Sequence, residues 1–598
     1  MFLRSQSWKT HLDLGANIQQ DGSTSFKVWA PFHLSLAVEI EKKGIFPLLK
    51  QPEGYFSLTV EEVGTQDCYF YVMENGLNRP DPVSRSLPKG VHGPTQIIDP
   101  YSYEWQDGDW KGIDLRDCIF YELHVGTFTS EGTFEAIIEK LDYLIDLGVN
   151  CIEIMPVAQF PGRWNWGYDG ASLYAPFSGY GGAEGLKQLV DASHQKGIAV
   201  CLDVVYNHLG PEGNYLGEFG PYFSEIYHTP WGKAFNYDGA YSDSVRDFVI
   251  KNALYWIVEY HIDALRLDAL HGIYDFSASP MLPELVVEVK KISEALGKKI
   301  HILAETGLND SRVVRPKEEG GWEMSALWND DFHHAAHVSL TNERGTYYQD
   351  FEGLSDLAKA LKRAFIYDGE YSVFRKKRHG NSAVGLSFEK FIVFIQNHDQ
   401  IGNRPLGERL SVLVGRERLK LAALLLLMTP SPPLLFMGEE YGERAPFEYF
   451  VDYEEEQLMR SIYEGRKKEF HKEDMPFPGK ESFDNSLLTW DMDRELFSLY
   501  RDLIAFRKQN LPKKGITGED VQVYYSPEEE WLAWEYQAES GKWIGVICYL
   551  GKEKDFIRLK LPFKHLSQGK VLLSTQKIAS LGGEGELTIS SDCAVVVG

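Results

Sequence analysis

Eight short apolar runs, separated by amphipathic segments, occupy the middle of the chain and restrict its possible folds most strongly. The runs cover residues 118–126, 151–157, 199–208, 264–270, 301–306, 326–332, 391–399 and 433–441. Near-continuous apolar strands are typical of a parallel sheet that helices cover on both faces. Because the strands alternate with helices and number eight, they predict a closed (β/α)8 barrel. A doubly wound open sheet is the alternative that this pattern leaves.

The segments between the runs carry helical periodicity. In residues 133–148, apolar side chains recur every three or four positions, and Gly148 stands where a helix would end. Such spacing places the apolar side chains on one face of a helix. Glycine is favoured as the C-terminal cap because it readily adopts the left-handed conformation. We therefore expect an amphipathic helix over residues 133–148.

Strand-like patterns flank this central region on both sides. Residues 1–105 alternate between apolar and polar side chains in short runs divided by Gly, Asn and Pro, which predicts an immunoglobulin-like β-sandwich. Residues 106–511 would form the barrel, and residues 512–598 a small C-terminal β-domain. Insertions near 209–243 and 443–491 fit neither strand nor barrel helix. Long ordered loops on a barrel are usually functional.

Charge and composition restrict the partners of the chain. The net charge of −26 disfavours nucleic acid and acidic membrane surfaces, whereas a neutral sugar is not repelled. The six cysteines show no CxxC spacing, so we expect no metal or other cofactor. The N-terminal residues lack the apolar region of a secretion signal, and prolines interrupt the longest apolar stretch, residues 421–437. We therefore expect a soluble, cytoplasmic protein.

Polar side chains gather at the ends of several predicted strands. They are Asp203, Asn207, His208, Arg266, Asp268, Glu305, His398 and Asp399. The active site of a (β/α)8 barrel lies at the C-terminal ends of its strands, so these side chains are expected to converge. One such acid alone could simply cap the next helix, but acids at several strand ends favour a site. The histidines and carboxylates could also bind a divalent ion, although no HxH or HExxH spacing supports it.

Asp268 and Glu305 form the central pair of this interpretation. One strand–helix–strand unit separates them, so they follow neighbouring strands. Adjacent strands lie about 4.8 Å apart, and retaining glycosidases need two carboxyl groups about 5 Å apart. Arg266, on the same face of its strand, would keep Asp268 ionised as the nucleophile. Burial and the proximity of Asp268 would raise the pKa of Glu305, the proton donor.

Neighbouring residues complete a sugar site. Asp399 would bind hydroxyls and stabilise the positive charge of the transition state. His208 and His398 would donate hydrogen bonds to sugar hydroxyls. The Gly-rich loop RWNWGYDG, residues 163–170, presents Trp166 and Tyr168, whose rings suit the apolar face of a pyranose. The alternative is that these rings only pack the loop.

Longer stretches resemble a known family. DVVYNH, LRLDAL, LAET and QNHD are similar to the four signature regions of the α-amylase superfamily, in the same order. YELHVGTFTSEGTF, WGYDGASLYAPFSGYGG and WNDDFHHAAHVSLTNE, together with further stretches between about 120 and 450, resemble the maltooligosyltrehalose trehalohydrolases more specifically. The resemblance implies that the chain hydrolyses the α-1,4 bond next to the terminal trehalose of maltooligosyl-trehalose, the product of a maltooligosyltrehalose synthase. No cofactor or catalytic metal belongs to that reaction.

The resemblance also assigns residues. Asp268 matches the family nucleophile, Glu305 the proton donor and Asp399 the transition-state stabiliser. With the residues named above, the expected substrate contacts are Trp166, Tyr168, His208, Arg266, His271, Asn329, Asp330, Asp331, Phe332, His333, His398, Gln400 and Asn403. The chain departs from the family pattern after Glu305: a short Asn- or Asp-rich run usually follows the acid directly, whereas here Thr306 to Leu308 precede Asn309 and Asp310.

Two other functions remain open at this point. A glycogen branching enzyme, which is a transferase, shares the signature regions, but its match to WNDDFHHA and NHDQIGNR is poor. A glycan-binding protein without activity would lack a catalytic carboxylate, whereas this chain carries all three. The products of the reaction would distinguish hydrolysis from transfer.

Overall fold

The computed structural model describes residues 13–472, 474–551, 556–566, 569–576, 580–581 and 586–598. Residues 1–12, which hold most of the segment examined for a secretion signal and the start of the predicted N-terminal sandwich, lie outside the described residues. Within the described part of the chain, no helix is both long and apolar enough to cross a membrane.

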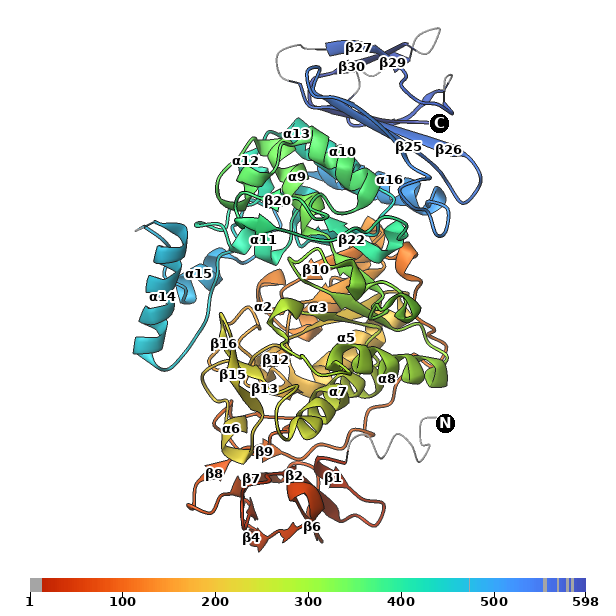
Figure 1. Ribbon diagram of the computed structural model, residues 1–598. Helices are drawn as coiled ribbons and strands as arrows, with labels where there is room; N and C mark the ends of the chain where they lie inside the picture. Colours follow the sequence, from red (N-terminus) through yellow and green to blue (C-terminus); the bar gives the residue numbers. More distant parts are fainter. Residues whose placement is uncertain (1–12, 473, 552–555, 567–568, 577–579, 582–585) are drawn as a thin grey trace.

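The centre of the molecule is a closed barrel of eight parallel strands (Figure 1). In order around the barrel, they are β10 (Phe120–Leu123), β11 (Cys151–Ile154), β14 (Ala199–Val204), β17 (Ala264–Leu267), β18 (His301–Ala304), β19 (Ala326–Trp328), β22 (Phe391–Phe394) and β23 (Pro433–Phe436). β23 pairs with β10 and closes the ring, which excludes an open sheet. The predicted fold class is thus confirmed, and each strand falls within one of the eight apolar runs.

Helices follow the strands and cover the outside of the barrel. They include α5 (Gly182–Gln195), α7 (Ser242–Glu259), α8 (Met281–Leu296), α9 (Asp330–Thr341), α10 (Leu354–Arg363), α13 (Arg416–Leu427) and α16 (Arg494–Gln509). Apolar side chains of these helices, such as Leu186, Phe248 and Leu285, are fully buried. The burial of these side chains against the strands is the main favourable contribution to such packing.

The helix predicted over residues 133–148 is divided in two. α3 (Phe134–Ile138) begins where the Thr133 side chain accepts a hydrogen bond from the backbone N–H of Ala136, and α4 (Leu141–Leu147) follows. Gly148 ends α4 with φ 99°, and its N–H bonds to the carbonyls of Leu144 and Ile145. A Cβ at this position would lie 2.6 Å from Cγ2 of Ile504 in α16, so glycine is required both by conformation and by space.

The N-terminal part consists of antiparallel sheets at one end of the molecule (Figure 1). One sheet has the order β1 (Gly15–Ile18), β2 (Thr24–Trp29), β6 (Tyr55–Val60) and β5 (Leu49–Lys50). The other contains β4 (Gly44–Pro47), β3 (Ala37–Ile40), β7 (Cys68–Val72) and β8 (Asn78–Arg79), and β9 (Thr95–Gln96) pairs with β7. Phe26 of the first sheet and Tyr69 of the second meet edge-to-face at 4.9 Å in the core between them.

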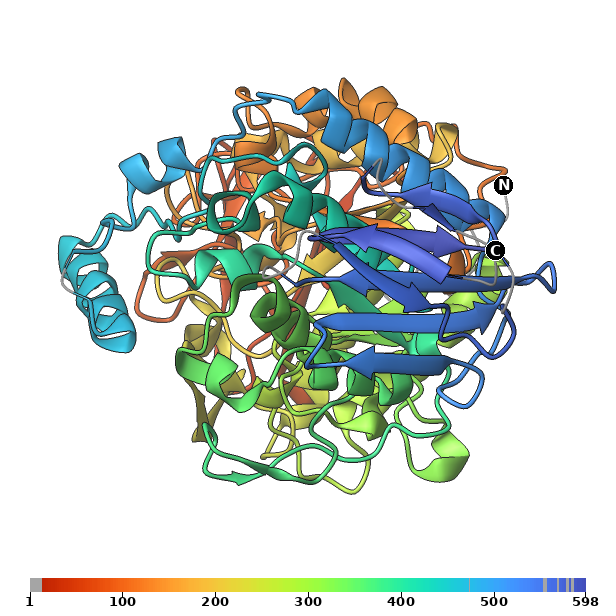
Figure 2. The ribbon, with the colours of Figure 1, turned by 90° about the horizontal axis from the view of Figure 1, so that it is seen from above.

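The C-terminal part lies at the opposite end and is also built from sheets (Figures 1 and 2). The larger sheet has the order β24 (Gln522–Ser526), β25 (Trp531–Gln537), β26 (Trp543–Tyr549), β31 (Cys593–Val597) and β28 (Val571–Ser574). The smaller has the order β27 (Phe556–Lys560), β30 (Glu586–Ser590) and β29 (Ser580–Leu581). The larger sheet packs on α13, where the Arg418 side chain donates to the carbonyl of Leu550 at 2.8 Å.

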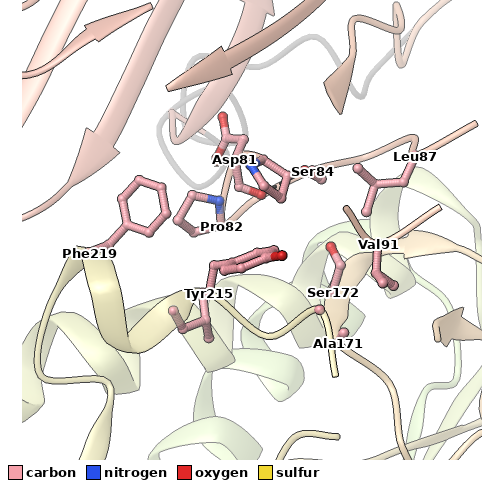
Figure 3. A pocket seen from close by; sticks show the side chains of 12 residues that line it. Asp81, Pro82, Ser84, Leu87, Val91, Ala171, Ser172, Tyr215 and Phe219 are labelled. Atoms are coloured by element: carbon pink, nitrogen blue, oxygen red, sulfur yellow. Dashed lines mark hydrogen bonds between the residues drawn. The ribbon is translucent and has the colours of Figure 1, made fainter. Parts of the chain in front are cut away.

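Both long insertions carry secondary structure of their own. The insertion after β14 contains α6 (Leu216–Phe219) and the hairpin of β15 (Phe223–Thr229) and β16 (Gly232–Phe235). The insertion after β23 contains α14 (Glu456–Phe470), which stands away from the barrel in Figure 1, and α15 (Lys480–Asn485). The first insertion also meets the N-terminal part: Figure 3 shows Tyr215 and Phe219 facing Pro82 across a small cavity.

Candidate active site

The three predicted catalytic carboxylates lie at one end of the barrel. Asp268 directly follows β17, Glu305 directly follows β18, and Asp399 lies in α11 (His398–Gly402) after β22. β17 and β18 are paired neighbours, with Leu267 opposite Ala304. The backbone N–H of Glu305 donates to the carbonyl of Leu267, so the backbones of Asp268 and Glu305 are held next to each other.

Arg266 connects three acids at this end of the barrel. Its Nη1 lies 2.6 Å from Asp203 Oδ2 and 3.1 Å from Asp268 Oδ1, and its Nη2 lies 3.6 Å from Glu305 Oε2. The Arg266 side chain is fully buried, and its guanidinium lies 4.2 Å from the centre of the Trp328 ring. A buried cation of this kind compensates for carboxylates that would otherwise repel one another.

Asn207 fixes the second oxygen of Asp268. Its Nδ2 donates to Asp268 Oδ2 at 2.9 Å and to the Asp268 carbonyl at 3.1 Å. The Oδ1 atom of Asn207 contacts Nδ1 of His208, which is itself buried. Burial lowers the pKa of His208, which favours the neutral ring. Each carboxylate oxygen of Asp268 therefore has its own donor, one from Arg266 and one from Asn207.

Glu305 lies in surroundings that favour its protonated form. Burial raises the pKa of this carboxyl, and the charges of Asp268 and Asp399 raise it further, although Arg266 acts in the opposite direction. Its Oε2 accepts a hydrogen bond from the backbone N–H of Ala269 at 2.7 Å. A carboxyl group that keeps its proton next to an ionised one can serve as a general acid.

Tyr168 contacts both Asp203 and His398. The Tyr168 hydroxyl donates to Asp203 Oδ2 at 2.6 Å, and its ring stacks on the His398 imidazole at 5.0 Å with an angle of 22°. Burial raises the pKa of Asp203 to about 7, even though Arg266 lowers it. Tyr168 remains partly exposed, as a sugar-contacting ring must be.

A second group of predicted residues reaches the same site from α9 and α11. Gln400 Nε2 donates to Asp330 Oδ1 at 3.4 Å, and Asn403 Nδ2 donates to Asp399 Oδ1 at 3.2 Å. Burial, followed by the charges of Glu305 and Asp399, raises the pKa of Asp330 to about 8. His271, which follows Asp268 on the next turn, is exposed. These polar groups therefore adjoin the carboxylates.

Trp166, which the sequence predicts as a sugar contact, is buried in the structure. It is 4% exposed, its ring stacks on Phe447 at 5.2 Å and 14°, and its Nε1 donates to the carbonyl of Glu448. The ring thus packs the loop after β11 against the insertion after β23. Contact of Trp166 with the substrate stays a prediction.

Four residues of the NDDFH segment make contacts that support the fold. The Asn329 side chain caps α9, and Phe332 is 2% exposed. Asp331 accepts hydrogen bonds from Asn309 Nδ2 and from the backbone N–H groups of residues 366 and 367. Nδ1 of His333 contacts the Ile395 carbonyl and its Nε2 contacts the Tyr348 hydroxyl. The polar side-chain atoms of Asn329, Asp331 and His333 thus have partners within the protein, and substrate contact by these four residues stays a prediction.

One aromatic residue was not anticipated from the sequence. Trp231 lies on the turn between β15 and β16, is 49% exposed, and stacks on His208 at 5.6 Å and 28°. It also lies 6.1 Å from His271. The sequence could have indicated Trp231, because an aromatic residue in a turn of a long insertion has no core to fill.

The metal alternative lacks support at these strand ends. Among the residues that the structure describes, the group of His, Asp and Glu able to hold an ion is His92, Glu212 and Glu454. None of the three follows β17, β18 or β22. The roles predicted for Asp268, Glu305 and Asp399 at a glycosidic bond need no metal ion.

The barrel, its carboxylates and a match of residues 97–227 to the family described as "Alpha amylase, catalytic domain" define an α-amylase-type glycoside hydrolase. A malto-oligosyltrehalose trehalohydrolase of Saccharolobus solfataricus is 48% identical over 498 residues, which cover 83% of this chain and 87% of that protein. Another, of Deinococcus radiodurans, is 38% identical and covers 98% of this chain and 96% of its own length. This chain belongs to the malto-oligosyltrehalose trehalohydrolase family.

The chain is also similar to a solved structure and, more distantly, to a branching enzyme. The crystal structure of a "putative alpha amylase" from Salmonella typhimurium superimposes with a TM-score of 0.89, at 36% identity, over 98% of this chain and 99% of that one. A 1,4-alpha-glucan branching enzyme of Corynebacterium efficiens is 27% identical over 84% of this chain and 69% of its own length. The branching-enzyme alternative is therefore the more distant relationship.

Proposed function

We propose that this chain hydrolyses the α-1,4 bond next to the terminal trehalose of a maltooligosyl-trehalose, with retention of configuration. The observation that carries the proposal is the pair of Asp268 and Glu305 on adjacent strands, bridged by Arg266. The family of the chain supports the choice of substrate, because its relatives are named for that reaction. No observation favours transfer over hydrolysis.

The first step of the proposed mechanism forms a covalent intermediate. An oxygen of Asp268 attacks the anomeric carbon of the glucose next to trehalose, and the bond from that carbon to the trehalose oxygen breaks. Glu305 gives its proton to the departing oxygen, so trehalose leaves as a neutral alcohol. Arg266 and Asn207 hold the two oxygens of Asp268 and thus determine the direction of attack.

The second step returns the enzyme to its starting state. Glu305, now ionised, takes a proton from water, and the resulting hydroxide attacks the same anomeric carbon. The ester bond to Asp268 breaks, and a maltooligosaccharide with an α-configured reducing end is released. Asp399 stabilises the positive charge that develops on the sugar ring in both steps, and Tyr168, His208, His271, Asp330, Gln400 and Asn403 bind its hydroxyls or those of trehalose.

Product analysis tests the proposal. Wild-type protein incubated with maltotriosyl-trehalose should release trehalose and maltotriose, and Asp268→Ala should release almost none. Asp109→Ala, which removes an exposed carboxylate that is not among the predicted site residues, should behave as wild type. Glucose or longer transfer products from the wild-type protein would refute the assignment.

Three expectations from the sequence belong to the same proposal. A maltooligosyltrehalose synthase would supply the substrate, because some enzyme must first create the trehalose end. A cytoplasmic location would place both enzymes together, and fractionation of cells tests it. Domain boundaries near 105 and 511 are proposed as well, and limited proteolysis should cut first near these positions.

A further inference from the structure

A buried acid that the proposed chemistry does not use lies against the active site. Glu122 belongs to β10 and is 1% exposed. Its Oε1 lies 2.5 Å from Nδ1 of His398, and its Oε2 accepts a hydrogen bond from the His398 backbone N–H at 3.0 Å. The two oxygens of Glu122 thus contact the ring and the backbone of His398. Both side chains are 1% exposed.

This contact decides which hydrogens the imidazole carries. A carboxylate can only accept hydrogen bonds, so Nδ1 of His398 must be the protonated nitrogen facing Glu122. A neutral ring has only one N–H, so its Nε2 would then be an acceptor. Nε2 lies 3.5 Å from Asp399 Oδ2, a second acceptor. Only the cationic ring can therefore donate toward both Glu122 and Asp399.

Several other groups act on the charge of His398. The titratable groups that face it from the surrounding elements are Glu122, His124, Glu153, Tyr168, Asp203, Arg266 and Asp399. Burial disfavours the cation most, and Arg266 disfavours it as well. Asp399 and Glu122 outweigh both, so the pKa of His398 is raised to about 9.

We propose that Glu122 is a positioning residue that keeps His398 cationic, so that Nε2 of His398 donates to Asp399 and to a hydroxyl of the bound sugar. The expected effect on sugar binding rests on the proposed function. The effect of Glu122 on the protonation of His398 does not, since that protonation can be measured without substrate. Loss of the proton turns Nε2 from a donor into an acceptor that faces the Asp399 carboxylate.

Glu153 offers a matched control. It is opposite Glu122 in the register of β10 and β11 and is equally buried, at 1% exposure. Burial and the charge of Glu122 raise the pKa of Glu153 well above its usual range, which favours the neutral carboxyl. Glu153→Gln therefore makes the same buried substitution while it leaves the contact of Glu122 with His398 in place.

Hydrogen–deuterium exchange at the imidazole C2 carbon, followed by mass spectrometry, reports the titration of a single histidine in a protein of this size. For the free protein, we expect a His398 midpoint of about 9 in the wild type and in Glu153→Gln. In Glu122→Gln, the midpoint should fall to the ordinary value of about 6.5 or below. At pH 8, the cationic fraction of His398 would then be about 30-fold lower in Glu122→Gln than in the wild type.

The consequence for binding is measured in a Glu305→Gln background, where the acid itself no longer titrates. Because only the cationic form is competent to donate, Glu122→Gln should weaken the binding of maltotriosyl-trehalose at least about 20-fold between pH 6 and pH 8. This loss is taken relative to the parent background at each pH, because Asp203 and Asp330 also titrate in this range. The Glu153→Gln version should stay within about two-fold of the parent at both pH values.

The outcomes separate the two proposals. A midpoint that stays near 9 in Glu122→Gln, or that falls equally in Glu153→Gln, would overturn the role of Glu122. If Glu122→Gln does not fold, the wild-type midpoint decides: about 9 supports the role, and 6.5 or below overturns it. A wild-type protein that neither binds nor cleaves maltotriosyl-trehalose would refute the proposed function, whereas the exchange data would still judge Glu122.

Discussion

Asn207→Ala tests whether the orientation of Asp268 contributes to the reaction. The substitution removes the donor that lies 2.9 Å from Asp268 Oδ2 and leaves Arg266 as the donor to Oδ1. A hydrogen bond to a charged group contributes about 1.5–3 kcal/mol. At about 1.36 kcal/mol for each factor of ten, its loss predicts a fall in kcat of about 10- to 150-fold. KM should stay within about two-fold, because Asn207 orients the attacking group and not the sugar.

Initial rates with maltotriosyl-trehalose measure this effect. Asn150→Ala is the matched control, since Asn150 makes two comparable hydrogen bonds, with Ile119 N and the Asp117 carbonyl, at the opposite end of the barrel. The control should lower the melting temperature and leave kcat nearly unchanged. A decrease of less than about three-fold in Asn207→Ala, or an equal decrease in the control, would refute the reasoning.

Two other substitutions have defined outcomes. Trp231→Ala should raise KM about five-fold, equivalent to about 1 kcal/mol of stacking, with little change in kcat; an unchanged KM would show that this exposed ring does not contact the substrate. His194→Asn tests a buried contact at the N-terminal end of β17, in which the imidazole lies 2.8 Å from both Asp107 and Asp263. Burial lowers the pKa of His194, but its hydrogen bonds to the two carboxylates outweigh this and raise it above the usual 6.5. A raised pKa means that the stabilisation is complete below pH 6.5 and is lost as the pH rises through the folded-state value. The loss of stability in His194→Asn, measured by urea unfolding, should therefore be larger at pH 6 than at pH 9, and equal losses would contradict the role of the charge.

The barrel could be predicted because its signal is local. Each strand is a short apolar run, and the covering segments repeat with helical spacing, so the sequence alone indicates eight strand–helix units. The break between α3 and α4 was not visible, because residues 139 and 140 keep the periodicity of the predicted helix. Helix ends of this kind depend on packing more than on residue type.

The site could be predicted only in part, because many of its side-chain contacts join residues that are distant in the sequence. Asp268, Glu305 and Asp399 follow strands, and the geometry of a barrel brings the ends of strands together. The packing of Trp166 on Phe447 and the contact of His333 with Tyr348 could not be predicted, because no regular spacing in the sequence relates these residues. The role of Glu122 could not be predicted either. Nothing in the apolar run around it indicates that its carboxylate contacts His398, which lies almost 280 residues later in the chain.

The central claim is that Asp268 and Glu305 hydrolyse maltooligosyl-trehalose with retention. Proton NMR of maltotriosyl-trehalose during the first minutes of digestion tests it most directly, because the anomeric signals show the configuration of new reducing ends before they equilibrate. The account predicts that α-maltotriose and trehalose form first and together. Initial release of β-maltotriose would exclude the covalent intermediate on Asp268, and release of glucose without trehalose would contradict the assigned substrate.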